Sequence, residues 1–138
     1  MKYWLMKSEP STWSWEQQIK AGAKGEGWDG VRNYQASNNM KAMSVGDLCF
    51  FYHSVKERDI IGIVKVIKEY HPDPTDKAKR FGMVRVVKHK ELKKRVNLDQ
   101  IKNDYRLSHL ALVKQSRLSV MPIDKKSWTI ICNLGGIK

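Results

Sequence analysis

Aromatic, amide and hydroxyl side chains crowd into one part of the sequence. Residues 28–39 read WDGVRNYQASNN, and residues 45–54 read VGDLCFFYHS. Flat rings can stack on a planar ligand, while amide and hydroxyl groups can hydrogen-bond to its edge. This mixture favours a binding site for a planar, polar ligand over an ordinary hydrophobic core.

A nucleobase requires three kinds of group from a protein, and this stretch contains all three. Trp28 and Tyr52 offer flat faces, and stacking contributes about 1–3 kcal/mol per base. Arg32 can contact a phosphate or stack on a base. The candidate groups for reading the edge of a base are Asn33, Asn38, Asn39 and Ser54. Any one of these residues also fits a structural role, but together they indicate a base pocket, with Trp28 stacking and Asn33 and Ser54 at the base edge.

The charge of the chain favours a polyanionic partner. There are 26 Lys and Arg against 14 Asp and Glu, a formal net charge of +12. Nucleic acid is therefore the expected partner, and a module that binds acidic proteins is an alternative. Nine basic residues and one acid, Glu91, fall within residues 77–95. The candidate phosphate contacts are Arg32, Lys77, Lys79, Arg80, Lys88 and Lys90.

Catalytic chemistry has weaker support in the sequence. His53 and Ser54 are adjacent, so on a strand their side chains point to opposite faces. Cys49 and His53 share a face but lie about 13 Å apart along a strand, too far for a nucleophile and its base. A non-enzymatic protein is thus preferred. The alternative is an enzyme on nucleic acid, such as a modified-base hydrolase or an RNA-processing activity, that uses Glu9, Asp29 or His53.

The sequence predicts no cofactor and no metal. Its four histidines have no metal-ligand spacing, and it has no phosphate-binding loop of the P-loop type. Cys49 and Cys132 lie among apolar residues and are expected to be reduced core residues. There is no signal-like apolar start and no run long enough for a membrane span. We therefore expect a cytoplasmic protein in a bacterium, or a nuclear one in a eukaryote.

The elements that must position these residues alternate between strands and short helices. Ser14 and Gln17 form a capping-box pattern, Asn33 is a candidate helix cap, and Gly62 is a candidate bulge. Strands are expected at residues 2–7, 48–53, 59–70, 82–91 and 118–123, and helices at 14–22, 33–43, 98–103, 108–115 and 125–134. With no repeat or linker, residues 1–138 are expected to form one α+β domain, a small mixed barrel of five to six strands with flanking helices.

Five motifs occur in an order that resembles the EVE domain family across almost the full length of the chain. They are KSEP at 7–10, WDGVRNYQASNN at 28–39, VGDLCFFYHS at 45–54, HPDPT at 71–75 and RLSV at 117–120. The resemblance implies a PUA-like fold, a strongly bent β-barrel with flanking helices. It also implies a reader of modified nucleobases, chiefly methylated or hydroxymethylated cytosine in DNA, with modified RNA bases as a further option.

The resemblance also implies which residues form the pocket. Carried over by motif, they are Lys7, Ser8, Glu9, Trp28, Val31, Arg32, Asn33, Tyr52, His53, Ser54, Arg117 and Ser119. Two positions depart from the family pattern. Ser37 stands where many members have a basic residue, which removes one candidate phosphate contact, and Phe81 stands near a frequent tryptophan. Both departures leave the choice of modified base open.

Overall fold

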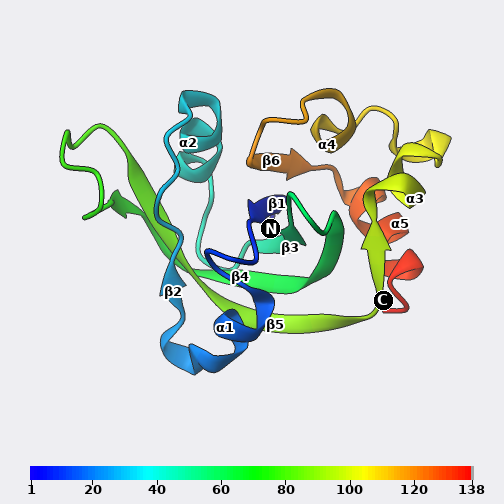
Figure 1. Cartoon of the computed structure of the whole chain (residues 1–138), viewed down its shortest axis with the longest axis horizontal. Helices are drawn as coiled ribbons and strands as arrows, with labels where there is room; N and C mark the ends of the chain where they lie inside the picture. Colours follow the sequence, from blue (N-terminus) through cyan, green and yellow to red (C-terminus); the bar gives the residue numbers. More distant parts are fainter. Residues whose placement is uncertain (138) are drawn as a thin grey trace.

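The computed structural model describes residues 1–137, within which six strands form one mixed sheet. The strand order is β2-β5-β4-β3-β1-β6, and the sheet is strongly bent (Figure 1). The strands are β1 (Tyr3–Ser8), β2 (Glu26–Gly27), β3 (Leu48–His53), β4 (Asp59–Pro72), β5 (Gly82–Asn97) and β6 (Val120–Ile123). β1 pairs in parallel with β3 and antiparallel with β6, and the other pairs are antiparallel. The predicted α+β class is confirmed.

Short helices surround the sheet. They are α1 (Trp15–Lys20), α2 (Tyr34–Lys41), α3 (Leu98–Lys102), α4 (Ala111–Lys114) and α5 (Lys125–Leu134), with 3-10 turns η1 (Gly22–Lys24) and η2 (Tyr105–Leu107). The predicted capping box of Ser14 and Gln17 opens α1, and Asn33 caps α2. In place of the helix expected at 108–115 there is a single turn, α4, preceded by η2. No helix within residues 1–137 has the length and apolar character that crossing a membrane requires.

The β4–β5 hairpin forms the long arm of the sheet and is shaped by Gly62. The strand register shifts between Ile60 and Gly62, so the predicted irregularity at this glycine is confirmed. The indole ring of Trp15 lies directly over Gly62, where a Cβ atom would stand 2.4 Å from the ring. Trp15 also donates its Nε1–H to Glu91 Oε1 at 2.9 Å. α1 is thus held against the bend of the hairpin.

The core continues from the inner face of the sheet to the candidate site. Phe50 stacks on Trp128 of α5, with ring centroids 3.9 Å apart. Its neighbour Phe51 makes edge contacts with both Trp15 and Trp28. Both cysteines are buried, as predicted, and burial raises the pKa of Cys132 to about 11. Phe51 therefore connects the packed core to Trp28, the first residue of the WDGVRN motif.

Candidate nucleic-acid interface

Three of the sequence motifs meet around one cavity of about 430 Å³. Its walls come from the end of β1 and the turn after it, from residues 26–32, and from Ser119 just before β6. This volume lies within the usual range for small-ligand sites. Of the predicted pocket residues, the cavity includes Lys7, Ser8, Glu9, Trp28, Val31, Arg32 and Ser119.

The turn after β1 supplies a wall that the sequence did not reveal. Backbone N–H groups of Thr12 and Trp13 donate to the Glu9 carbonyl at 2.9 and 3.0 Å, and the Ser8 hydroxyl donates to the Trp13 carbonyl at 2.5 Å. The Trp13 indole N–H then donates to the buried Gln18 side chain at 2.9 Å. These bonds fix Trp13 as an aromatic wall of the cavity. No sequence pattern pointed to it, because its place depends on the shape of this turn.

Trp28, a residue of the cavity wall, carries an indole N–H that has no acceptor within residues 1–137. Its backbone N–H donates to the Val84 carbonyl at 2.7 Å, and its ring meets Phe51 edge-on at 5.4 Å. Three other indole N–H groups reach side-chain acceptors, those of Trp4, Trp13 and Trp15. The Trp28 N–H has no such acceptor among residues 1–137, yet that part of the chain contains no fully buried side-chain polar atom without a partner. The Trp28 N–H is therefore not fully buried, and it belongs to a residue of the cavity wall.

Charged groups of both signs share the cavity. The Lys7 ammonium donates to the Ser116 carbonyl at 2.9 Å, and burial lowers the pKa of Lys7. Opposite charge comes from the carboxylates of Glu9, Glu26 and Asp29. Loss of hydration, followed by the negative charges of Asp73 and Glu26, raises the pKa of Asp29. A ligand edge with both donors and acceptors would find partners here.

Arg32 is held by the HPDPT loop. Its guanidinium donates to Asp73 at 3.1 Å and to the Thr75 hydroxyl at 2.9 Å. The Asp73 side chain is fully buried and also accepts the backbone N–H of Gly30 at 2.9 Å. Burial would raise the pKa of Asp73, but hydrogen bonds from Thr75, Gly30 and Arg32 lower it to about 2. Arg32 thus has a structural partner as well as a place in the cavity wall.

The amide side chains of α2 serve mainly to hold the backbone. Asn33 accepts the Ala36 N–H at 2.9 Å as the helix cap, and Asn39 donates to the Val120 carbonyl at 2.7 Å, joining α2 to β6. Asn38 is exposed. Asn33 and Arg117 line a separate shallow cavity of about 320 Å³. The structure does not bring these amides or Arg117 to the wall of the main cavity.

The YHS segment at the end of β3 also lies behind the cavity wall. Tyr52 and His53 are buried, and burial raises the pKa of Tyr52 to about 12. His53 Nε2 accepts the Trp15 backbone N–H at 3.1 Å, so the proton is on Nδ1, which faces Glu57 at 3.3 Å. Ser54 donates its backbone N–H to the Ser8 carbonyl at 3.0 Å. Residues 52–54 therefore do not line the cavity, but Ser54 holds the backbone of the wall residue Ser8 in place.

The predicted phosphate contacts divide into two groups. Lys77, Lys79 and Arg80 line a second cavity at the tip of the β4–β5 hairpin. Lys88 and Lys90 are exposed along β5. Ser37 is buried, with its hydroxyl 2.7 Å from that of Tyr70, so this position faces the hairpin and not solvent. The structure therefore offers no phosphate contact at Ser37.

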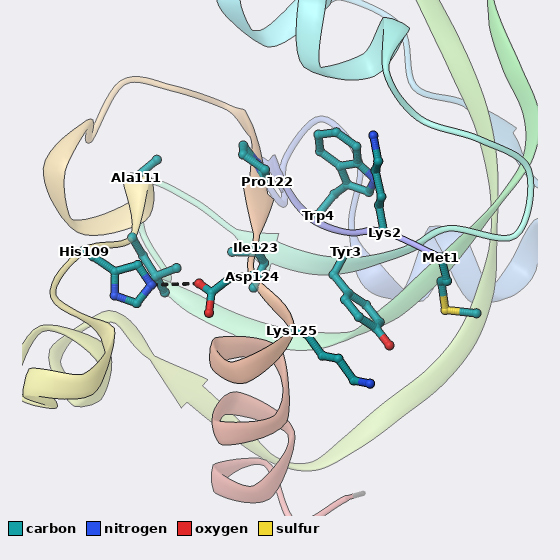
Figure 2. Close-up of a pocket in the computed structure, with 11 residues that line it drawn as sticks. Met1, Lys2, Tyr3, Trp4, His109, Ala111, Pro122, Ile123, Asp124 and Lys125 are labelled. Atoms are coloured by element: carbon teal, nitrogen blue, oxygen red, sulfur yellow. Dashed lines mark hydrogen bonds and ion pairs between the residues drawn. The ribbon is translucent and has the colours of Figure 1, made fainter.

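A larger cavity, of about 760 Å³, lies at the opposite end of β1 (Figure 2). Figure 2 shows His109 paired with Asp124, and the distance from His109 Nε2 to Asp124 Oδ1 is 2.7 Å. Ser127 donates its hydroxyl to the same carboxylate at 2.8 Å, while the other oxygen of Asp124 caps α5. A hydrolytic triad places aspartate and serine on different ring nitrogens of the histidine, whereas here Asp124 Oδ1 and the Ser127 hydroxyl, at 3.2 Å, both face His109 Nε2. The arrangement is that of a helix cap, and the sequence motifs contribute nothing to this cavity.

Metal ligation has no candidate site in the described residues: within 1–137, no three His, Cys, Asp or Glu side chains are grouped to hold an ion. What the fold does present is a polar, aromatic-walled cavity at the end of a central strand of a bent sheet. This arrangement defines a ligand-binding domain of the PUA-like class. The chain belongs to the EVE domain family, whose model matches residues 2–134.

Comparisons with individual proteins agree with this assignment. Thymocyte nuclear protein 1 of Rattus norvegicus is 33% identical over an alignment 164 positions long that covers 96% of this chain and 73% of that protein. The NMR structure of Rpa0253 from Rhodopseudomonas palustris is 48% identical, with a TM-score of 0.93 and coverage of 99% of this chain and 94% of that one. The crystal structure of human THYN1 in complex with 5-methylcytosine-containing DNA is 32% identical, with a TM-score of 0.90 and coverage of 100% and 99%.

A more distant likeness shows the fold alone. The YTH domain of Zygosaccharomyces rouxii MRB1, solved in complex with N6-methyladenosine RNA, is 16% identical with a TM-score of 0.58. The alignment covers 99% of this chain and 88% of that one. The expected PUA-like architecture is confirmed by this shared fold together with the similarity to human THYN1.

Proposed function

We propose that this chain is a non-enzymatic reader that holds one modified nucleobase of a nucleic acid in the cavity between β1, residues 26–32 and Ser119. The observation that carries the proposal is the Trp28 indole N–H, which lacks a protein acceptor within residues 1–137, is not fully buried, and belongs to the wall of a cavity that also contains carboxylates and an ammonium group. Human THYN1, 32% identical over the whole chain, was crystallised with 5-methylcytosine-containing DNA. Modified cytosine in DNA is therefore the preferred ligand.

The cavity suits the hydrogen-bonding edge of cytosine. Cytosine donates from its exocyclic amino group, and Asp or Glu is a common acceptor for that group. Glu9 and Asp29 provide such acceptors, while the Trp28 N–H and Lys7 are donors for the ring nitrogen and carbonyl. Val31 and Trp13 supply apolar wall for a methyl group.

The rest of the nucleic acid is held by charge. The net charge of +12 and the basic residues of β5 and the hairpin tip attract the phosphate backbone irrespective of sequence. Base selectivity then comes from the cavity and affinity from the phosphates. Such a protein would act in the cytoplasm of a bacterium or in the nucleus of a eukaryote.

The contacts of the candidate catalytic residues His53, Glu9 and Asp29 favour recognition over catalysis. His53 has both ring nitrogens engaged away from the cavity, by Trp15 and Glu57. Glu9 and Asp29 remain on the wall, where the proposal uses them as acceptors. A modified oligonucleotide recovered chemically unchanged after long incubation supports the reader, and turnover that disappears in an Asp29→Asn protein contradicts it.

The experiment is a binding panel of matched DNA and RNA oligonucleotides carrying cytosine or 5-methylcytosine, measured at two salt concentrations. Trp28→Phe keeps a ring but removes the N–H, which is worth about 0.5–1.5 kcal/mol. We expect this variant to bind methylated DNA roughly 3–10-fold more weakly, with its salt dependence unchanged. Trp128→Phe is the matched control, because Trp128 is as buried as Trp28 but packs on Tyr3 and Phe50. Equal affinity of the wild-type protein for methylated and unmethylated oligonucleotides would refute the proposal.

A further inference from the structure

A second cavity, of about 650 Å³, lies between α2 and the tip of the β4–β5 hairpin. Tyr34, Ser37 and Lys41 follow one face of α2, and all three reach the hairpin. The Tyr34 ring lies 4.9 Å from that of Phe81, the Ser37 hydroxyl is 2.7 Å from that of Tyr70, and the Lys41 ammonium sits 5.5 Å from the Tyr70 ring centroid. These three contacts hold α2 and the hairpin tip in fixed positions on either side of the cavity.

Basic side chains outnumber acidic ones in the wall of this cavity. Its walls include four basic residues: Lys41, Lys77, Lys79 and Arg80. Within residues 1–137, none of the four forms an ion pair with an acid. The acids of the cavity have other partners: Asp76 accepts backbone N–H groups of Ala78, Arg80 and Phe81, and Asp73 holds Gly30, Arg32 and Thr75. The cavity is thus prepared for an anion.

An aromatic surface lies beside these cations. Tyr34 is 61% exposed, although it is a large aromatic residue in a helix that packs against the sheet. The buried Phe81 ring supports it, and the Arg32 guanidinium lies 5.8 Å from the Phe81 ring centroid. An exposed ring next to unpaired cations is the combination that binds a nucleotide without reading its sequence.

One ion pair separates this cavity from the candidate base cavity. Arg32 belongs to the wall of the base cavity, its partner Asp73 belongs to the wall of the second, and their atoms are 3.1 Å apart. Two binding spaces that share a wall one ion pair thick can be occupied by consecutive residues of one polymer.

We infer that the hairpin-tip cavity binds the nucleotide next to the recognised base, with its phosphate on Lys41 and Arg80 and its base against Tyr34. This inference rests on the proposed function, since it assigns the neighbour of the base held in the first cavity. The protein then recognises a dinucleotide step in which one base is read and the adjacent nucleotide anchors the strand.

The test compares 5-methyldeoxycytidine 5′-monophosphate with the two 5′-phosphorylated dinucleotides that carry a thymidine on its 5′ or 3′ side, so that each dinucleotide adds one base and one phosphate, by NMR titration. For the wild-type protein, we expect one dinucleotide to bind about tenfold more tightly than the mononucleotide, in keeping with one stacked base and one phosphate. In Lys41→Gln/Arg80→Gln, most of this gain should disappear, while the preference for the methylated over the unmethylated mononucleotide stays.

The matched control is Lys102→Gln/Lys126→Gln, which removes the same charge from α3 and α5, on the side of the molecule away from the hairpin tip (Figure 1). It should retain the gain. No gain in the wild-type protein, or an equal loss in both double variants, overturns the inference. Absence of any preference for the methylated mononucleotide in the wild-type protein instead defeats the proposed function, and the inference with it.

Discussion

The backbone N–H of Gly30 donates to the buried carboxylate of Asp73 at 2.9 Å, joining the wall of the candidate base cavity to the tip of the β4–β5 hairpin. Gly30 has a φ of 78°, a left-handed conformation in which a larger residue is strained. The same carboxylate accepts from Arg32 and from Thr75. The aspartate of the HPDPT motif therefore has a structural role, because it ties the loop at the hairpin tip to Gly30 and Arg32 in the wall of the candidate base cavity.

Asp73→Asn should destabilise the fold in a pH-dependent manner. The pKa of about 2, against an ordinary 3.8, means that the ionised form contributes about 2 kcal/mol to stability. Because the folded-state pKa is lowered, this contribution is present above pH 4 and is lost as the pH falls toward 2. Urea unfolding should show a deficit of about 2 kcal/mol at pH 7 that shrinks below pH 4.

The control for this prediction is Asp99→Asn, at an exposed position in the first turn of α3. It makes the same chemical change and should cost only a few tenths of a kcal/mol. A deficit for Asp73→Asn that stays constant from pH 7 to pH 2.5 would show that the ionised carboxylate is not the stabilising form.

Gly62→Ala should destabilise the protein through its contact with Trp15. The added methyl would lie 2.4 Å from two atoms of the indole ring and 2.8 Å from the Lys90 carbonyl, so the ring must move. Overpacking of this kind costs about 1–3 kcal/mol. Trp15→Phe removes the colliding part of the ring, so in the double variant the alanine should cost less than in the single one. Additive losses in thermal unfolding would contradict this account.

His53→Phe should weaken folding without changing base selectivity. The substitution keeps a ring of similar size but removes the acceptor of the Trp15 backbone N–H, at a cost of about 1–3 kcal/mol. Since His53 is not on the cavity wall, the ratio of affinities for methylated and unmethylated DNA should be unchanged. His89→Phe, at an exposed position of β5, serves as the control. A folded His53→Phe protein that has lost discrimination would place this residue in the binding machinery.

Binding of a methylated oligonucleotide should weaken at acidic pH because of Asp29. Its pKa is raised by loss of hydration and by the charges of Asp73 and Glu26, so it takes up a proton at a higher pH than an ordinary aspartate. A protonated carboxyl is a poorer acceptor for an amino group, so affinity should fall as the pH drops through that raised pKa. Asp29→Asn keeps one acceptor oxygen and should flatten this part of the pH profile, as fluorescence anisotropy can measure.

The local signals of the sequence predicted the local structure well. The capping box of Ser14 and Gln17 and the cap at Asn33 depend on neighbouring residues only, and both are confirmed. The bulge at Gly62 is also confirmed, because a glycine inside a strand pattern is itself a signal of an irregularity. β2 was missed because its two residues, Glu26 and Gly27, have no periodicity and are defined only by pairing with Arg85 and Val86 of β5. Pairing between strands that are distant in the sequence cannot be predicted from the residue pattern of one segment.

The end of β5 was also predicted wrongly because it depends on pairing between distant strands. The prediction ended at Glu91, whereas the strand continues to Asn97. Its second half, LKKRVN, has too few apolar residues to alternate clearly, and only Leu92 and Val96 turn inward. This half is held as a strand by its pairing with β4 around Asp59 and Ile60 and with the chain end at Gly135.

The predicted site residues that the fold brings to one cavity come mainly from motifs at strand ends. Lys7, Ser8 and Trp28 line the cavity as expected. Asn33 and Ser54 were expected at the base edge, but neither lines this cavity. The Asn33 amide caps α2, and a capping amide looks the same in a sequence as an amide that reads a ligand. Trp13 was missed because only the turn formed by the Glu9 and Ser8 hydrogen bonds brings it to the wall.

β1 lies between β3 and β6, and its two partners come from distant parts of the chain. During synthesis the first strand must therefore wait for residues 120–123 before its outer edge is paired, and such long-range closure slows folding. Ser119, just before β6, completes the cavity wall. Its carbonyl also accepts the Lys7 backbone N–H. The cavity wall is therefore complete only when β6 has paired with β1, and a protein cut short before this strand would carry every basic residue of the hairpin but no complete pocket.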